Sequence, residues 1–191
     1  MLRAFIAIEI SQEARDALIE VTSQLKQHGA AGVRWVKPES IHLTLKFLGD
    51  IDLSLVNGLL EAIRTSAEGT SPFTIGLSEI GAFPKADSPR VIWVGIDGGT
   101  DTLVSLQRRV DKEASSVVGI PAETRPFKPH LTLGRTRDNV STNERRKIGE
   151  ELAKVTLHSR VSWLADEIKL IRSTLTPEGA IYNTLGSVTL R

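Results

Sequence analysis

The string His-Leu-Thr-Leu occurs twice in this chain of 191 residues, at positions 42–45 and again at 130–133. The two copies lie 88 positions apart and hold two of the four histidines. Each copy alternates polar and apolar residues, the period of a half-buried β-strand. The chain is therefore expected to present two histidines from two similar strands. A pair of imidazoles in such frames can act as one general acid and one general base.

The repetition extends beyond this motif. An offset of 88 residues also aligns residues 5–8 with 93–96, Asp50 with Asp138, and residues 79–80 with 167–168. No gap is needed over roughly 80 residues, and a repeat of this length indicates a duplicated unit. We therefore predict one domain over 1–191 with an internal repeat at about 2–80 and 90–171.

Each half is predicted to hold a strand, a helix, the motif strand, a second helix and a closing strand, in that order. In the first half these are 2–8, a helix after the possible cap Ser11, 41–48, 53–66 and 73–80; in the second they are 91–96, a helix after Thr100, 129–135, 142–155 and 161–171. Loops are predicted at 81–89 and 119–128, and a last strand within 180–190 after a turn at 177–179. This order favours an α+β fold with helices on the outer faces of two antiparallel sheets.

The composition excludes several kinds of site and partner. The chain has no cysteine, which excludes disulfides, thiolate zinc sites, iron–sulfur clusters and cysteine nucleophiles. Its net charge is +1, so a site for a polyanion has to be a local patch. Residues 1–10 are apolar but short and interrupted by charge, which is typical of a strand and not of a signal peptide or membrane span. We therefore expect a cytoplasmic protein.

Strand geometry gives the two motifs a polar and an apolar face, because alternate side chains point to opposite sides. The side chains predicted to share the polar faces are His42, Thr44 and Lys46 in the first copy and His130, Thr132 and Gly134 in the second. The leucines of each motif, with Phe47 in the first, are expected to face the helices. Trp93 is likewise expected in the core. The polar faces are then left to line a cleft between the two halves.

Two histidines and two threonines around one cleft suit a phosphodiester. The ordinary imidazole pKa is near 6.5, so one ring can be protonated while its partner is neutral. Threonine hydroxyls can donate to the phosphate oxygens on which charge develops. No metal is required by this scheme. Two alternatives stay open: a structural role for each histidine, and a metal site, although two histidines without a nearby carboxylate or cysteine are too few for zinc.

The chain resembles the 2H phosphoesterases, and within them the RNA 2′,3′-cyclic phosphodiesterases, also called the LigT-like or 2′-5′ RNA ligase family. The resemblance covers essentially the whole chain and rests on residues 3–8, 42–49, 81–84 and 129–135. It implies a bilobal, pseudo-twofold fold in which the motif strands flank a central groove. It also implies opening of a 2′,3′-cyclic phosphate at an RNA end to leave a 2′-phosphate.

The resemblance implies a role for each motif residue. His42 would be the general acid that protonates the departing 3′ oxygen, and His130 the general base that activates water. Thr44 and Thr132 would hold the phosphate oxygens. Arg135 is harder to place, because strict alternation aims it at the apolar face. A bulge at Gly134, or the end of the strand there, would free Arg135 to bind phosphate, and a surface arginine is the alternative.

The remaining predictions concern partners and reactions. The expected substrates are RNA with 2′,3′-cyclic phosphate ends or small cyclic nucleotides, with no cofactor, no membrane partner and a monomeric state. The alternative functions are 2′-5′ RNA ligation and a non-catalytic RNA- or nucleotide-binding module. His28 and His158 fall outside the motifs and are excluded from catalysis. Side chains that are candidates for an RNA groove are Arg34, Trp35, Lys37, Lys85, Arg90, Arg125, Lys128 and, on the first motif strand, Lys46.

Overall fold

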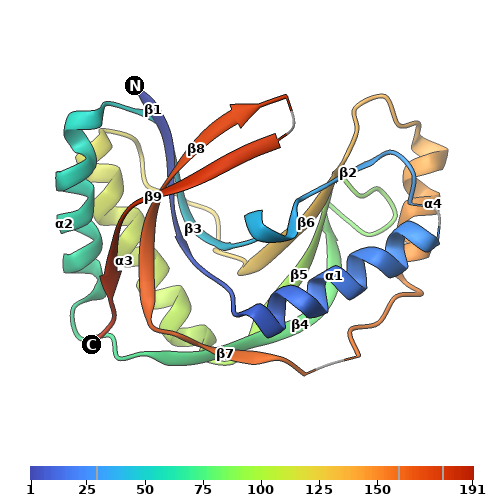
Figure 1. Ribbon diagram of the computed structural model, residues 1–191, viewed down its shortest axis with the longest axis horizontal. Helices are drawn as coiled ribbons and strands as arrows, with labels where there is room; N and C mark the ends of the chain where they lie inside the picture. The colour runs from blue at the N-terminus through green and yellow to red at the C-terminus, as the bar shows by residue number, and fades with distance from the viewer. Residues whose placement is uncertain (29, 159, 178) are drawn as a thin grey trace.

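The structure is a computed structural model that describes residues 1–28, 30–158, 160–177 and 179–191 (Figure 1). The helices in these ranges are α1 (Gln12–Gln27), α2 (Val56–Ala67), α3 (Thr100–Val118) and α4 (Thr142–Leu152), with short 3-10 turns η1 (Pro38–Ser40) and η2 (Leu53–Leu55). The strands are β1 (Leu2–Ile8), β2 (Val33–Trp35), β3 (Leu43–Ile51), β4 (Phe73–Phe83), β5 (Val91–Asp97), β6 (His130–Thr136), β7 (Ser162–Ala165), β8 (Glu167–Thr176) and β9 (Gly179–Thr189). The predicted α+β class is confirmed.

The strands of the described ranges form a nine-stranded antiparallel sheet in the order β7-β4-β5-β6-β3-β1-β8-β9, with β2 beside β6. Leu43 of β3 pairs with Leu131 of β6, and this pairing joins two four-stranded arms. One arm is β7-β4-β5-β6 and the other is β3-β1-β8-β9. The antiparallel sheets predicted from the sequence are thus two arms of one continuous, curled sheet (Figure 1).

Each arm contains strands from both halves of the chain. β4, which closes the first half, pairs with β5 of the second half. β8, which belongs to the second half, pairs with β1 of the first. Because the closing strands are exchanged in this way, neither half of the chain completes a sheet arm by itself.

The closing strand predicted at 161–171 is two strands with different partners. β7 pairs with β4, whereas β8 pairs with β1, so the chain passes from one arm to the other at Asp166. The Asp166 carbonyl accepts a hydrogen bond of 2.7 Å from the backbone N–H of Leu190. Asp166 and Glu167 interrupt the apolar pattern at this crossing, so the prediction of a single strand over 161–171 is wrong there. The turn predicted at 177–179 includes residue 178, which lies outside the described residues.

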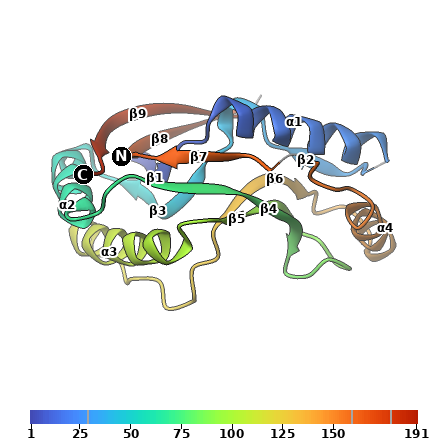
Figure 2. The same cartoon turned by 90° about the horizontal axis from the view of Figure 1, so that it is seen from below.

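The helices form close to their predicted positions, although α2 begins at Val56 after the turn η2 and α4 ends at Leu152, three residues before its predicted end. Helix α1 begins after Ser11, whose Oγ accepts from the backbone N–H of Ala14 at 3.1 Å. Helix α3 begins at Thr100, after Gly99 in the left-handed region. In Figures 1 and 2, α2 and α3 lie together at one end of the sheet and α4 lies at the other. Across the described residues, no helix combines the length and apolarity needed to cross a membrane.

The buried apolar residues lie on both sides of the sheet but in unequal clusters. The main core joins the helices to the motif leucines, including Leu43 and Leu131, and to Ile6 and Ile8 of β1. The alternate residues of β1 belong to a second, small cluster made of Phe5, Ala7 and Ile171, with Tyr182 packed against it. The helices therefore cover one face of this arm, and the face with the small cluster is left to form a groove.

Candidate active site

Both motif histidines are held by the same backbone contact. The Nδ1 atom of His42 lies 2.8 Å from the carbonyl oxygen of Ser40, and Nδ1 of His130 lies 2.7 Å from that of Lys128. A carbonyl oxygen only accepts hydrogen bonds, so each Nδ1 carries a proton and donates it. The Nε2 atom of each ring is then the one that can gain or lose a proton near neutral pH.

β3 and β6 present the two rings on one side of the sheet. Leu43 and Leu131 pair with one another and are fully buried, so the histidine before each turns to the opposite face. Continuing the antiparallel register sets His42 opposite Thr132 and Thr44 opposite His130. The histidines are thus diagonal neighbours, a kind of pair whose members lie about 7–8 Å apart in a regular sheet. The four motif side chains predicted to share a cleft are brought together.

A bulge in β3 changes which side chains follow Thr44 on the groove side. Thr44 and Lys46 pair with successive residues of β1, which leaves Leu45 as an extra residue. The alternation is therefore inverted beyond Leu45. The Lys46 side chain is only 10% exposed and forms an ion pair with Asp111 of α3, while Phe47 is 64% exposed. The predictions that Lys46 shares the polar face and that Phe47 lies in the core are both wrong.

β6 carries a bulge at the equivalent position. Thr132 and Gly134 pair with successive residues of β5, which leaves Leu133 as the extra residue. Arg135 is thereby turned to the side of Thr132, and its side chain lines a pocket in the groove. Of the two arrangements that could free Arg135, a bulge and the end of the strand, the bulge is present, one residue before Gly134.

The first strands of the two halves pair with the motif strands at different offsets. Ala7 pairs with Thr44, and the residue that pairs with Thr132 is Trp93. In the gap-free alignment of the two halves, however, Trp93 is equivalent to Phe5 and not to Ala7. The two halves are thus shifted by two residues at this strand, which keeps the same faces in the groove because the strand period is two.

Gly134 is covered by β2, a strand that the sequence analysis did not predict. Three residues are too few to show a periodicity. A Cβ atom at Gly134 would lie 2.7 Å from Cγ1 of Val33 and 3.0 Å from Cε3 of Trp35. Trp35 also packs against the main core, so it supports β6 from behind and is not a free ring for a base.

The His42 ring lies in an aromatic setting. It stacks on Phe5, with ring centroids 4.4 Å apart and an interplanar angle of 21°, and meets Tyr182 edge-on at 5.3 Å. Phe5 and Tyr182 belong to the small cluster on the groove side. The His42 ring is thus fixed in plane by its neighbours as well as by the Ser40 carbonyl.

The His130 ring has different aromatic neighbours. It meets Phe83 edge-on at 5.0 Å and lies 6.3 Å from Trp93 between ring centroids. The Trp93 ring covers Gly81, where a Cβ atom would come within 2.4 Å of it. Trp93 is therefore a half-buried wall residue of the groove, and its prediction as a core residue is wrong.

Burial lowers the pKa of both histidines. Loss of hydration is the largest cause for His42 and for His130, and the backbone carbonyl behind each ring partly opposes it. Charged neighbours then distinguish them: Glu9 raises the pKa of His42, whereas Arg135 lowers that of His130. Glu9 acts on His42 while also pairing with Lys169 at 2.7 Å. The charged neighbours alone therefore favour a protonated His42 and a neutral His130.

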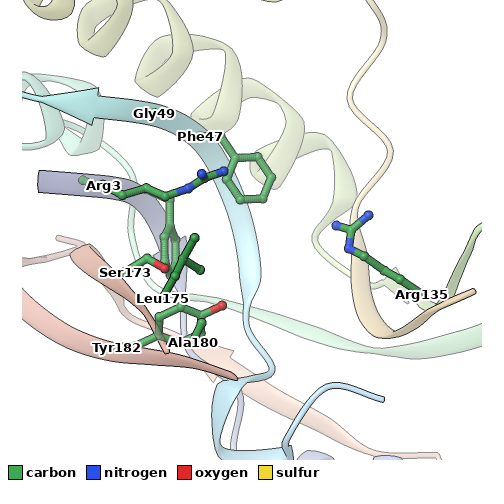
Figure 3. A pocket seen from close by; sticks show the side chains of 10 residues that line it. Arg3, Phe47, Gly49, Arg135, Ser173, Leu175, Ala180 and Tyr182 are labelled. Carbon is green, nitrogen blue, oxygen red and sulfur yellow. The ribbon is translucent and has the colours of Figure 1, made fainter. Parts of the chain in front are cut away.

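A pocket of about 320 Å³ adjoins His42 on the β3-β1-β8-β9 arm. Phe5 and Tyr182, which touch the His42 ring, also line it. In Figure 3, Arg3, Phe47 and Tyr182 come from β1, β3 and β9, and Arg135 comes from β6 across the gap. Two guanidinium groups and an exposed aromatic ring are groups that bind phosphate and stack on a base.

Sequence reasoning missed Arg3 and Tyr182 as parts of this site. An arginine inside the apolar strand 2–8 is a signal that one face of that strand is wet. Tyr182 gives a weaker signal, although it is the only tyrosine of the chain. Both reach the site because β1 and β9 lie on the same arm as β3, which is a property of the strand order.

The other predicted basic residues lie outside the pocket lining. Lys85 pairs with Asp87 at 3.1 Å, and Arg125 pairs with Glu123 at 2.8 Å. Lys128 contributes its backbone carbonyl to His130. Side chains exposed elsewhere are Arg34, Lys37 and Arg90. Among the described residues, no cluster of three or more His, Cys, Asp or Glu side chains is arranged to hold a metal ion.

The two histidines outside the motifs lie away from this pocket. Nδ1 of His28, at the end of α1, lies 3.6 Å from a carboxylate oxygen of Glu151. His158 lies 3.5 Å from the hydroxyl of Thr156. Neither lines the pocket beside His42.

Comparison with known proteins places the chain among relatives of similar length. The model of the LigT like Phosphoesterase family matches residues 8–93 and again 94–182. A protein of Methanothermobacter thermautotrophicus named RNA 2′,3′-cyclic phosphodiesterase is 35% identical over 96% of both chains. One of Thermotoga maritima with the same name is 33% identical over 96% of this chain and 93% of its own.

Solved structures share the fold. TT0787 of Thermus thermophilus matches with a TM-score of 0.79 and 26% identity, over 100% of this chain and 98% of its own. E. coli LigT complexed with 3′-AMP matches with a TM-score of 0.74 and 24% identity, over 99% and 98%. Since the family model covers most of the chain in two consecutive matches and the relatives span nearly all of it, this protein belongs to the LigT-like phosphoesterases of the 2H family.

Proposed function

We propose that this protein hydrolyses 2′,3′-cyclic phosphate ends of RNA to 2′-phosphates, without a metal, by paired-histidine acid–base catalysis. The observation that carries the proposal is the matched anchoring of two imidazoles, with the Ser40 carbonyl behind His42 and the Lys128 carbonyl behind His130. Two such rings supply both proton transfers that hydrolysis of a phosphodiester needs. The names of the relatives support the same reaction.

In the proposed reaction, water attacks phosphorus while the bond between phosphorus and the 3′ oxygen breaks. Nε2 of His130 takes a proton from the water, and Nε2 of His42 gives its proton to the departing 3′ oxygen. The products are a 2′-phosphate and a free 3′-hydroxyl, and the rings return to their first protonation states through solvent. The charges support this division, since Glu9 favours a protonated His42 and Arg135 favours a neutral His130.

Thr44 and Thr132 are proposed to bind the non-bridging phosphate oxygens. Both are half-buried on the motif strands, in register with the histidines. A hydroxyl that donates to these oxygens stabilises the charge that develops in the transition state. Arg135 is proposed to add a guanidinium, whose planar donors match two phosphate oxygens at once.

The pocket beside His42 is proposed to take the terminal nucleoside. The departing 3′ oxygen belongs to the ribose, so the nucleoside has to lie on the side of the general acid. Phe47 is the exposed ring of this pocket, and Arg3 is its second guanidinium. We infer that the base stacks on Phe47 and that Arg3 contacts a backbone phosphate.

A 2′-5′ RNA ligase is the second candidate function. The observation that favours it is again the pair of anchored rings, because attack by a hydroxyl group of RNA needs the same base and the same acid as attack by water. A 5′-hydroxyl would then take the place of water. A module that only binds RNA or nucleotides is the remaining alternative.

Product analysis of one defined RNA tests these functions. An oligoribonucleotide with a 2′,3′-cyclic end is incubated with the protein in EDTA, with and without a second RNA that carries a 5′-hydroxyl. We expect a 2′-phosphate at an undiminished rate. A 3′-phosphate would overturn the assigned leaving group, and full loss in EDTA would overturn the metal-free reaction. Joined RNA in excess of hydrolysis would favour the ligase, and tight binding without any product would favour the binding module.

A further inference from the structure

Helix α3 buries polar side chains against the first motif strand. Gln107, Asp111 and Ser115 are 6%, 5% and 4% exposed, and their spacing of four residues puts them on one stripe of the helix. α3 packs against β3, the strand that begins after His42. A buried polar stripe costs stability unless its groups find partners, so each contact of this stripe needs an explanation.

Gln107 contacts the bulge itself. Its Nε2 donates to the backbone carbonyl of Leu45 at 3.2 Å, and Leu45 is the extra residue that β1 does not match. A bulge disrupts the ladder at its extra residue. The side-chain amide of Gln107 supplies a partner there and so stabilises the bulged form of β3 against a regular one.

The two carboxylate oxygens of Asp111 contact two different segments of the chain. Oδ1 pairs with Nζ of Lys46, the residue that the bulge turns away from the groove. Oδ2 accepts from the backbone N–H of Glu123 at 2.8 Å, in the loop that leads to Lys128 and His130. One buried carboxylate therefore ties β3 to the loop that precedes the second motif.

The second motif strand is supported by different means. Its bulge at Leu133 is followed by Gly134, and the position that Lys46 occupies on β3 is here filled by Val33 and Trp35 of β2. The hydrogen bond that Gln107 of α3 makes therefore supports the bulge of β3 and has no counterpart at the bulge of β6. An effect of losing Gln107 is expected to fall on His42 and not on His130.

We propose that Gln107 and Asp111 are positioning residues of the site, which hold the Leu45 bulge and thereby set the positions of His42, Thr44 and Phe47. This inference rests on the proposed function for its kinetic consequence but not for its structural one. Without the bulge, strict alternation would bring Lys46 into the groove and turn Phe47 into the core. Neither Gln107 nor Asp111 lines the pocket, so their effect has to pass through β3.

The first test is Gln107→Leu, which keeps the volume and removes the hydrogen bond. The matched control is Ser115→Ala on the same stripe, because the Ser115 hydroxyl has no hydrogen-bond partner within the described residues. We expect the Gln107 variant to fold, to lose about 10- to 100-fold in kcat, and to keep KM within about threefold. The Ser115 variant should keep the wild-type rate. A normal kcat in Gln107→Leu would overturn the proposal.

A second measurement does not depend on turnover. The imidazole cross-peaks of His42 and His130 are followed by NMR and assigned with the two histidine-to-alanine variants. In Gln107→Leu the His42 signal should move while the His130 signal stays. Unchanged signals for both would overturn the positioning role even if the rate fell. If the wild-type protein lacks phosphodiesterase activity but the His42 signal still moves in the variant, only the proposed function is overturned.

Asp111 is tested in pairs so that no buried charge is left alone. Lys46→Met/Asp111→Asn removes both charges but keeps an oxygen for the Glu123 N–H. Lys46→Met/Asp111→Leu removes that acceptor as well. We expect the second double variant to lose more kcat than the first at equal thermal stability. Equal kcat values for the two double variants would show that the contact of Asp111 with the loop does not matter for the site.

A Gln107→Glu variant tests the contact with the bulge, because a carboxylate cannot donate to the Leu45 carbonyl. Normal NMR signals and a normal kcat in this variant would show that this contact does not matter.

Discussion

Leu43 of β3 and Leu131 of β6 pair across the junction of the two sheet arms, and both side chains are fully buried. The residue before each is a motif histidine, and the residue after each is a motif threonine. Because strand side chains alternate, burying this leucine pair forces all four polar neighbours to the other face. A core contact between two leucines thus gathers the groups of the candidate site.

Replacing either motif histidine should abolish most of the activity and leave the fold intact. His42→Ala and His130→Ala are each expected to lower kcat by about 10²- to 10⁴-fold, the range for a positioned acid or base. Turnover of a cyclic-ended oligonucleotide measures the loss, and circular dichroism checks the fold. His28→Ala is the matched control and should keep the wild-type rate. A near-normal rate in either motif variant would remove that ring from the mechanism.

The pH dependence should be bell-shaped and centred on the acidic side. Burial lowers the pKa of both rings, so both limbs should lie below the ordinary value of about 6.5. The acid limb reports protonation of the base His130, and the alkaline limb reports deprotonation of the acid His42. The profile of kcat/KM against pH measures both limbs.

Removing the charge of Arg135 or of Glu9 should shift one limb of the pH profile and leave the other in place. Arg135 lowers the pKa of His130, so Arg135→Met should raise it and move the acid limb to higher pH. Glu9 raises the pKa of His42, so Glu9→Gln should lower it and move the alkaline limb to lower pH. A shift of the opposite limb in either variant would contradict the assignment of acid and base.

Removing the exposed ring of the pocket should weaken substrate binding. Stacking of a base on an aromatic ring contributes about 1–3 kcal/mol, so Phe47→Ala should raise KM about 5- to 150-fold. Its stability should change little, because the ring is 64% exposed. Leu53→Ala is a matched control, since Leu53 is 67% exposed and outside the pocket. Equal KM values for both variants would contradict the stacking role.

Two glycines should respond in opposite ways to an added methyl group. Gly134→Ala places Cβ 2.7 Å from Val33, so we expect a loss of about 1–3 kcal/mol in the free energy of unfolding. Gly58→Ala meets Cγ1 of Val117 at 3.4 Å inside α2 and should gain about 0.5–1 kcal/mol, the helix preference for alanine. Thermal or urea unfolding of both variants measures the difference. A stable Gly134→Ala would show that β2 does not press on β6.

Replacing one member of the buried Lys46–Asp111 ion pair should lower the free energy of unfolding more than replacing both members. Lys46→Met leaves the Asp111 carboxylate buried without its cation, an imbalance worth about 3–5 kcal/mol. The double variant Lys46→Met/Asp111→Asn leaves no unpaired charge buried, so its free energy of unfolding should be higher than that of the single variant. Urea unfolding compares the two proteins. A single variant as stable as the double would show that water reaches Asp111.

Local patterns predicted most of the elements. β1 and α1 follow from a short apolar run and from a serine cap before an apolar stripe, and both form as predicted. Prediction failed where the partner of a strand decides the outcome. The bulge at Leu45 exists because β1 pairs with β3 in a shifted register, and nothing in the string 42–48 shows this shift. Strict alternation therefore predicts the wrong faces for Lys46 and Phe47.

The sequence by itself determined which groups this protein carries, because the repeated His-x-Thr motif, the strand period and the lack of cysteine are all local properties of the chain. The tertiary structure alone decided where those groups meet. The exchange of β4 and β8 between the arms, the bulges at Leu45 and Leu133, and the meeting of Arg3 and Tyr182 in one pocket all depend on contacts between segments far apart in the chain. Such contacts are set by register and packing, and neither leaves a periodic trace in one strand.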